Sequence, residues 1–400
     1  MKKILSIMLT LVLIFSLAAC GGSDQSGGDT TAENAEKSEE SGDSSSEDGT
    51  VEITYATWGM ETEMQEMVDL YNASQNQVHV TLQVTPLSEY GTLMNEVLGT
   101  EEGPDVLWAG LQTRLWGNAG MLAELQDKVT EDQMDLSVFM EYPLKQNYVG
   151  DTLYGIPCYT DSYAICYNKA VFDKYGVEYP KEGWNWNDYE ALAEELNSKI
   201  KAEGGNEFAS ALAINEPAHG TLLLLTCNGA KLYNEDVTAC ALNVPESVEM
   251  LEMVQRMVES GAQADYDTLV ETNAASLFLS GLAGMIIICP DPGANGLFEG
   301  TSEKETLDYI AFPNGPTSGT NYIDTVTMNN IVINSGTTKF DAAWDFVKWY
   351  TTNQEALDAY AKIEWHLPTN VNAFDAWEAS HDYAEVYVEE ADKVVTVWDV

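Results

Sequence analysis

The sequence predicts an α/β fold in two unequal lobes, and two stretches of alternating strands and helices carry that prediction. In the first stretch, Val51 to Trp108, the apolar pattern changes from strand to helix and back, and it ends on a third strand. This order is typical of a sheet whose parallel strands are joined by right-handed crossover helices. A second such stretch begins near Ile156. The 400 residues, 45% of them hydrophobic, suffice for two domains with sizeable cores.

The first stretch contains five expected elements. Val51 to Trp58 alternates and is rich in β-branched and aromatic residues, which is typical of a strand. Apolar residues then recur at helical spacing from Met64 to Tyr71. The remaining elements are a strand at Val78 to Val84, a helix at Tyr90 to Gly99 and, after the breaker Gly103-Pro104, a strand at Asp105 to Trp108.

The second stretch is longer and ends in a helix. Asn187 is placed to cap a helix whose apolar face runs from Tyr189 to Ile200. Another helix begins at Pro245 and stops before Gly261, since proline suits the first turn of a helix and glycine its end. Further expected elements are strands at Tyr163 to Tyr167, Phe208 to Ile214, Leu282 to Cys289, Leu307 to Phe312 and Met328 to Ile333, and a helix at Phe340 to Thr351.

The first twenty residues have the layout of an export signal. Lys2 and Lys3 precede an apolar run from Ile4 to Leu17. The tetrapeptide Leu17-Ala18-Ala19-Cys20 resembles the lipobox of bacterial lipoproteins, in which the cysteine is diacylated after cleavage. We therefore expect residues 1–19 to be a signal peptide and Cys20 to anchor the chain to the extracellular face of the cell membrane. The alternative is an ordinary signal peptide in which Cys20 is incidental.

Residues 20–50 are expected to form a disordered acidic linker behind the lipid. Of residues 21–50, thirteen are Gly or Ser, nine are Asp or Glu and one is Lys, and none is aromatic, Leu, Ile or Val. Such a segment buries too little apolar surface to offset the entropy of ordering. The folded body therefore begins near Val51.

Charge and cysteine content exclude several classes of function. The formal net charge of −47 repels nucleic acid, so we expect no nucleic-acid partner. After Cys20 five cysteines remain, with no Cys-x-x-Cys pair and no histidine at ligand spacing, so we expect no metal site, no cofactor and no disulfide framework. Cys166 and Cys289 are interpreted as small core residues. A bridge between Cys227 and Cys240, which bracket an expected hairpin, stays open.

Seven segments in a fixed order resemble the extracellular solute-binding proteins of sugar-type ABC importers, the family 1 or maltose-binding-protein-like group. The resemblance covers nearly everything from Val51 to about Asn372. The segments are Trp58-Gly59; Pro104 to Trp108 followed by Gly120 to Leu125; Tyr154 to Pro157 leading to Tyr167-Asn168-Lys169; Trp184 to Asp188; Phe278 to Ile286 before Pro290; Ala343 to Val347; and Leu367-Pro368-Thr369.

This resemblance implies a two-lobed periplasmic-binding-protein-like fold (type II). Each lobe would be a mainly parallel sheet flanked by helices, with hinge strands between the lobes. Lobe one would comprise residues 51–155 and 294–334, and lobe two residues 156–293 and 335–400. The protein would be a monomer that passes its ligand to the permease subunits of an ABC transporter. Family members usually continue further beyond the Leu-Pro segment, so the expectation is a reduced tail or a fragment.

A carbohydrate ligand needs flat aromatic platforms for its C–H face and planar polar groups for its hydroxyls. Ligands of α/β sheets bind where strands end, so we expect the site there. Asp161 is the strongest polar candidate because an acidic residue between two tyrosines at a hinge has little packing role. We expect Trp108→Ala or Asp161→Ala to weaken binding and leave the fold intact. The candidates are Trp58, Glu61, Trp108, Gln112, Trp116, Tyr159, Asp161, Asp291 and Trp365, the last beside His366.

Three rival functions are open at this point. A secreted glycosidase needs two carboxylates flanking the scissile bond, and 65 acidic residues offer many pairs without marking one. A binding protein for a non-sugar solute would share the same fold. An adhesin or structural lipoprotein would share the anchor but show neither solute binding nor turnover.

Overall fold

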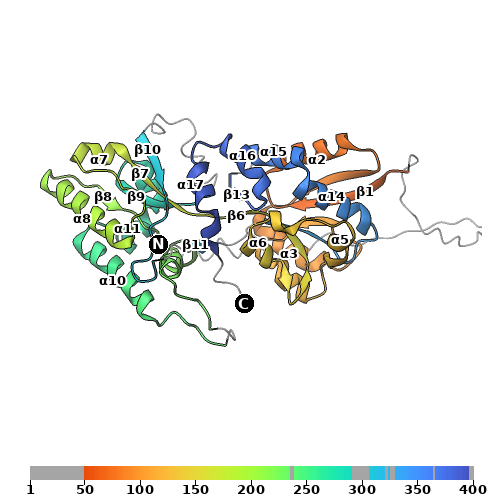
Figure 1. Cartoon of the computed structure of the whole chain (residues 1–400), viewed down its shortest axis with the longest axis horizontal. Helices are drawn as coiled ribbons and strands as arrows, with labels where there is room; N and C mark the ends of the chain where they lie inside the picture. The colour runs from red at the N-terminus through yellow and green to blue at the C-terminus, as the bar shows by residue number, and fades with distance from the viewer. Residues whose placement is uncertain are drawn as a thin grey trace, which may run out of the picture. The chain divides into compact units, whose positions relative to one another are not determined.

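The computed structural model describes residues 49–234, 238–290, 306–319, 323–324, 329–363 and 365–395. Within these residues the chain forms two main sheets with helices packed on them, so the predicted α/β class is confirmed (Figure 1). The predicted signal peptide, the lipidation of Cys20 and nearly all of the linker fall on residues 1–48, outside the described part.

The larger sheet has six strands in the order β13-β6-β12-β3-β1-β2. Strand β1 is parallel to both β2 and β3, whereas β12 is antiparallel to β3 and to β6, and β13 is antiparallel to β6. The bounds are β1 (Val51–Thr57), β2 (Val78–Val84), β3 (Val106–Trp108), β6 (Gly155–Thr160), β12 (Asn329–Ile333) and β13 (Leu367–Pro368).

The smaller sheet has four strands in the order β10-β7-β9-β8. Strand β7 is antiparallel to β10 and β9, and β8 is parallel to β9. The bounds are β7 (Ala164–Asn168), β8 (Phe208–Ser210), β9 (Ala283–Ile288) and β10 (Leu307–Ile310). Two short pairs complete the described strands: β4 (Tyr148–Val149) with β5 (Thr152–Leu153), and β11 (Ile323–Asp324) with β14 (Val394–Val395).

Both sheets are mixed, whereas the sequence predicted mainly parallel ones. The predicted crossovers are present: β1, β2 and β3 are parallel because α2 and α3 connect them. Strands β6, β12 and β13 come from distant parts of the chain, and hydrophobic alternation carries no information on the direction of such strands. Most strands of each sheet still run in one direction, and the strands that run the other way are β12 and β13 in the larger sheet and β7 in the smaller one.

Helices cover both sheets, and Figure 1 shows α7, α8 and α10 grouped with β7 to β9, and α14 near β1. Those of the first series and the chain's end are α2 (Glu61–Ser74), α3 (Leu87–Val97), α4 (Thr113–Asn118), α5 (Gln126–Glu131), α6 (Glu141–Lys145), α14 (Phe340–Thr352), α15 (Gln354–Ile363), α16 (Phe374–Glu378) and α17 (Ala384–Glu389). Those of the second series are α7 (Lys169–Tyr175), α8 (Trp186–Ala202), α9 (Leu223–Cys227), α10 (Pro245–Ser260), α11 (Tyr266–Glu271) and α12 (Ala274–Leu279). Short 3₁₀ or π turns are η1 (Gly110–Gln112), η2 (Leu136–Val138), η3 (Pro217–Leu222), η5 (Val371–Ala373) and η6 (Ala391–Lys393).

Local signals set the ends of α8 and α10. Helix α10 spans Pro245–Ser260 as predicted, and Gly261 closes it with a φ of 79°, a conformation that favours glycine. Helix α8 is capped by Asn185, not by the predicted Asn187. Asn185 accepts from the amides of Asn187 and Asp188 while the Asp188 carboxylate accepts from the Asn185 amide, which is a capping box.

The cores divide between the sheets differently from the predicted lobe ranges. Helix α14 packs on the six-stranded sheet, where Phe346 and Tyr350 meet Tyr55 with ring centroids 5.2 and 5.9 Å apart. The predicted range 335–400 assigned this helix to lobe two. Strand β10 pairs with β7 of the four-stranded sheet, although the predicted range 294–334 assigned it to lobe one. Both differences arise from returning segments, whose partner sheet depends on contacts distant in sequence.

Candidate functional site

Strand direction brings the predicted aromatic residues to one edge of the six-stranded sheet. Strands β1, β3 and β6 run in the same direction, because two antiparallel steps through β12 separate β6 from β3. Their carboxyl ends therefore share one edge, which carries Trp58, Trp108 and Tyr159. Strand β13 runs the other way, so its amino end lies at the same edge and brings His366 there.

These four side chains form what we call the aromatic row: Trp58, Trp108, Tyr159 and His366. The ring centroids of Trp58 and Trp108 lie 5.2 Å apart in an edge-on arrangement, and those of Trp108 and Tyr159 lie 6.4 Å apart at 88°. The Tyr159 and His366 rings are stacked at 4.7 Å with only 10° between their planes. The row is thus held by ring contacts of the kind that stabilise aromatic pairs beyond their burial.

Exposure differs along the row. The Trp108 side chain is 1% exposed and packs edge-on against Tyr55 as well, at 6.4 Å, so it is also a core residue. The Trp58 and His366 side chains are half-buried, so these two members of the row are partly open to solvent. Trp58 is followed by a strained turn, because Met60 has a φ of 54°, a left-handed conformation that a side chain other than that of glycine adopts at a cost.

Several buried polar atoms near the row lack a hydrogen-bond partner among the described residues. The Asn329 amide nitrogen donates to the Tyr159 hydroxyl, while Asn329 Oδ1 accepts nothing. Trp108 Nε1 and Ser162 Oγ are likewise buried and unpaired. An unsatisfied buried polar atom costs about 1–3 kcal/mol, so these three atoms, one in the row, one on its partner Asn329 and one next to Asp161 in the chain, need an explanation.

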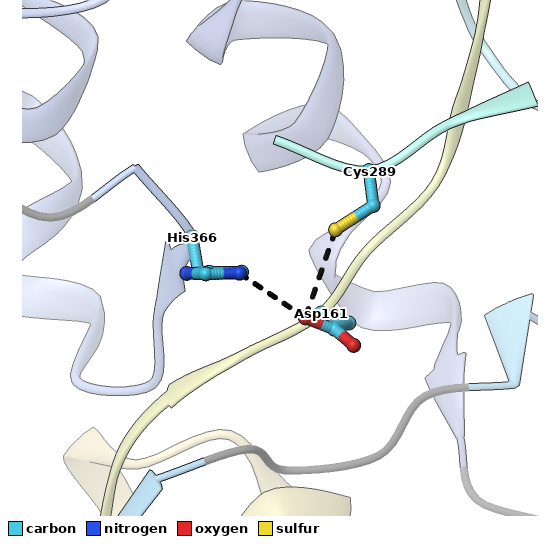
Figure 2. Close-up of side chains that lie close together, drawn as sticks. All are labelled: Asp161, Cys289 and His366. Atoms are coloured by element: carbon cyan, nitrogen blue, oxygen red, sulfur yellow. Dashed lines mark hydrogen bonds and ion pairs between the residues drawn. The ribbon is translucent and has the colours of Figure 1, made fainter. Parts of the chain in front are cut away.

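The row continues into a polar cluster centred on Asp161. This residue lies in the connection between β6 of the larger sheet and β7 of the smaller one, and its side chain is almost fully buried. His366 Nε2 lies 3.5 Å from Asp161 Oδ1, and the Cys289 thiol lies 3.6 Å from the same oxygen (Figure 2). We call Asp161, Cys289 and His366 the Asp161 cluster.

The other predicted site residues lie elsewhere. The Trp116 side chain is 1% exposed, and its Nε1 donates to Asn95 Oδ1 at 2.7 Å, so it packs against α3 as a core residue. Glu61 is exposed in the first turn of α2, where a carboxylate is favourable to the helix dipole, and Gln112 is exposed at the end of η1. Trp365 is half-buried beside His366, and Asp291 lies outside the described residues.

The structure adds residues that the sequence analysis did not single out for the site. No sequence pattern marks Asn329 as a site residue. Tyr360 stacks on Tyr159 at 6.2 Å, but in the sequence it is indistinguishable from any other residue on the apolar face of a helix. Cys289 was interpreted as a core residue, and it is half-buried next to Asp161. Cys227 is buried in α9 and Cys240 is exposed, and both are free thiols, so the bridge left open above is not formed.

Comparison with known proteins identifies the family. Residues 58–357 match the family described as bacterial extracellular solute-binding protein. A Brucella abortus protein named as a binding protein is 25% identical over 356 residues, covering 87% of this chain and 81% of that protein. The maltotriose-binding protein of Pyrococcus abyssi is 24% identical over 326 residues, covering 80% of this chain and 66% of its own length.

Solved structures share the fold. The sugar-binding protein MalE of Xanthomonas citri superposes with a TM-score of 0.73 at 19% identity, covering 88% of this chain and 87% of that one. An ABC substrate-binding protein of Listeria monocytogenes in complex with cycloalternan gives a TM-score of 0.70 at 23% identity, covering 87% and 88%. These neighbours are two-lobed binding proteins, which agrees with the predicted fold class.

No helix within the described ranges is long and apolar enough to cross a bilayer. The family match spans most of the chain, the aromatic row lies where strands of the larger sheet end, and the Asp161 cluster adds Cys289 from the end of β9 in the smaller sheet. The chain belongs to the bacterial extracellular solute-binding proteins, the family to which the sequence resemblance pointed.

Proposed function

We propose that this protein captures a carbohydrate, an oligosaccharide in particular, at the aromatic row and delivers it unaltered to the permease of an ABC importer. The observation that carries the proposal is the row itself: four rings at one sheet edge, ending at a buried carboxylate. A pyranose presents an apolar face that packs on aromatic rings and a rim of hydroxyls that both donate and accept.

The unpaired polar atoms support a hydroxyl-bearing ligand. Trp108 Nε1 is a donor, Asn329 Oδ1 is an acceptor and Ser162 Oγ is both. A solute with several hydroxyls that reached these atoms would satisfy all three and remove their desolvation cost of about 1–3 kcal/mol each. An apolar solute would leave them unpaired, so the site would discriminate against it.

Relatives with named ligands agree with this assignment. They include a maltotriose-binding protein, a structure in complex with cycloalternan and a cyclic α-maltosyl-1,6-maltose binding protein of Arthrobacter globiformis. The names maltotriose and maltosyl-maltose refer to ligands of several sugar units. We therefore expect α-linked glucose oligomers to be the first compounds worth testing.

Capture would work by closure of two lobes, one built on each main sheet. Asp161 lies in the connection that leaves β6 of one sheet and enters β7 of the other, which is where a hinge would act. A ligand favours the closed state only through contacts that differ between open and closed states. Contacts to residues from both sheets would supply that difference.

We further propose that the chain is a monomer without catalytic activity, tethered by lipid on Cys20 behind the 20–50 linker. Glycoside hydrolysis needs two carboxylates at a set separation, whereas the described aromatic row ends at one, Asp161. The anchor is supported by the signal sequence and the lipobox-like tetrapeptide ending in Cys20.

The test is a calorimetric and tryptophan-fluorescence titration with linear and cyclic gluco-oligosaccharides. We expect saturable binding with no released product. Asp161→Asn and Trp58→Ala should each weaken sugar binding at least about 30-fold, the equivalent of a 2 kcal/mol hot spot. Matched controls are Asp267→Asn, an exposed acid on α11, and Trp349→Ala, a half-buried indole on α14. Release of shorter sugars, or unchanged affinity in both site variants, would contradict the proposal.

A further inference from the structure

The Asp161 cluster has a geometry that carbohydrate binding does not require. Its three residues come from three separate segments: the β6–β7 connection, the residue after β9 and the residue before β13. Cys289 Sγ and His366 Nε2 both point toward Asp161 Oδ1 (Figure 2). One ligand-type atom from each residue lies within 4.8 Å of the other two.

The His366 separation is long for a charge-assisted hydrogen bond to a carboxylate, whereas the Cys289 thiol donates a sulfur hydrogen bond to the same oxygen. A charge-assisted N–H···O⁻ bond is about 2.7–2.9 Å long, whereas His366 Nε2 lies 3.5 Å from Asp161 Oδ1. The Cys289 sulfur is 3.6 Å from that same oxygen. Both groups face one oxygen, not each other, so the arrangement is also not a thiolate–imidazole pair of the kind that activates a nucleophile.

The same separations fit the edges of a metal-centred tetrahedron. Zinc bonds of about 2.3 Å to sulfur, 2.0 Å to nitrogen and 2.1 Å to oxygen hold sulfur and oxygen about 3.6 Å apart and nitrogen and oxygen about 3.4 Å apart. The observed values are 3.6 Å and 3.5 Å. Two edges of the tetrahedron thus match, and the third, from sulfur to nitrogen, would be about 3.5 Å in the same geometry and lies within 4.8 Å here.

From this match we propose that Asp161, Cys289 and His366 bind a divalent zinc ion, with the fourth position open to an exogenous ligand. A thiolate, an imidazole and a carboxylate together suit zinc and disfavour calcium or magnesium, which take oxygen ligands. Tyr159, stacked on the His366 ring at 4.7 Å, holds the imidazole in the required orientation. No local motif marks this site, because Asp161 and His366 are 205 positions apart, so the sequence led us to expect no metal site.

Cobalt substitution tests this site directly and without any sugar, so its outcome is independent of the proposed function. The full chain carrying Cys20→Ser, reduced and stripped with a chelator, is titrated with Co²⁺. We expect one ion per chain, intense visible d–d bands from tetrahedral coordination and a near-ultraviolet thiolate-to-cobalt charge-transfer band. Added Zn²⁺ should displace the cobalt and abolish these bands.

Variants then assign the ligands. Cys289→Ser should abolish the charge-transfer band. Cys289→Ser and His366→Gln should each weaken Zn²⁺ binding by more than about 100-fold. Loss of a residue that only supports a metal ligand already weakens metal binding about 10- to 100-fold. Cys240→Ser, at an exposed free thiol, is the matched control and should change neither. Circular dichroism verifies that each variant is folded. No thiolate band in the parent chain, or unchanged zinc affinity in folded Cys289→Ser and His366→Gln, would overturn the proposal.

Discussion

Replacing Trp108 with alanine tests how much this indole contributes to the packing of the aromatic row. The side chain is 1% exposed, and its ring packs edge-on against Tyr55, Trp58 and Tyr159. Removing a buried tryptophan costs about 3–5 kcal/mol of unfolding free energy. The variant also removes Nε1, an unpaired buried donor whose burial costs about 1–3 kcal/mol. The middle values of these two terms, about 4 and about 2 kcal/mol, give a net expected loss of about 2 kcal/mol for Trp108→Ala.

This expectation corrects the sequence-based one, in which Trp108→Ala left the fold intact. Trp108→Phe tests the two terms separately, because it keeps an aromatic ring and removes the N–H group. We expect it to cost less than half as much as Trp108→Ala. Trp58→Ala, at a half-buried side chain, should cost less stability than Trp108→Ala while weakening ligand binding.

The assay is urea unfolding followed by far-ultraviolet circular dichroism, with each variant compared at equal m-value. The near-ultraviolet spectrum of folded protein verifies that packing around the row persists in Trp108→Phe. An average point mutation costs about 1 kcal/mol of unfolding free energy. A smaller loss than that in Trp108→Ala would refute the argument that this indole acts mainly as a core residue.

Three further perturbations follow from the structure. Burial raises the pKa of Glu207, but hydrogen bonds from Lys174 and Tyr175 outweigh burial and lower the pKa to about 2. The stability that this carboxylate contributes is therefore complete above pH 4.5 and is lost as the pH falls from 4.5 toward 2. The difference in unfolding free energy between wild type and Glu207→Gln, measured by urea titration, should shrink over that window, and a constant difference would contradict this expectation. Asn185→Ala should destabilise the protein by about 1 kcal/mol through loss of the α8 capping box, and an unchanged urea midpoint would count against that role. Cys20→Ala should release the exported protein into the medium, as fractionation and immunoblotting would show, whereas retention with the membrane would argue against the lipid anchor.

Local signals in the sequence were sufficient for several elements. Pro245 and Gly261 bracket α10, and the apolar spacing from Met64 to Tyr71 falls inside α2 with both residues buried. These elements depend on residues a few positions apart, for which spacing and capping chemistry carry the information. The family resemblance, drawn from ordered segments, anticipated the family match and the two-lobed neighbours.

The candidate site was only partly predictable, because its members meet through long-range pairing. Tyr159 and Asp161 follow from the rule that ligands bind where strands end. Trp116 fits the same rule in sequence, yet its Nε1 donates to Asn95 from a neighbouring helix, a contact that no local pattern reveals. Cys289 and Asn329 reach the site because β9 and β12 come from distant parts of the chain.

Isothermal calorimetry of the full chain with gluco-oligosaccharides of increasing length, combined with chromatography of the recovered sugar, tests the central claim most directly. We predict one saturable site, a quenched or shifted tryptophan emission, affinity weakened at least about 30-fold in Asp161→Asn, and sugar recovered at its original length. Absence of heat and fluorescence change across the panel, or recovery of shortened sugar, would contradict that claim.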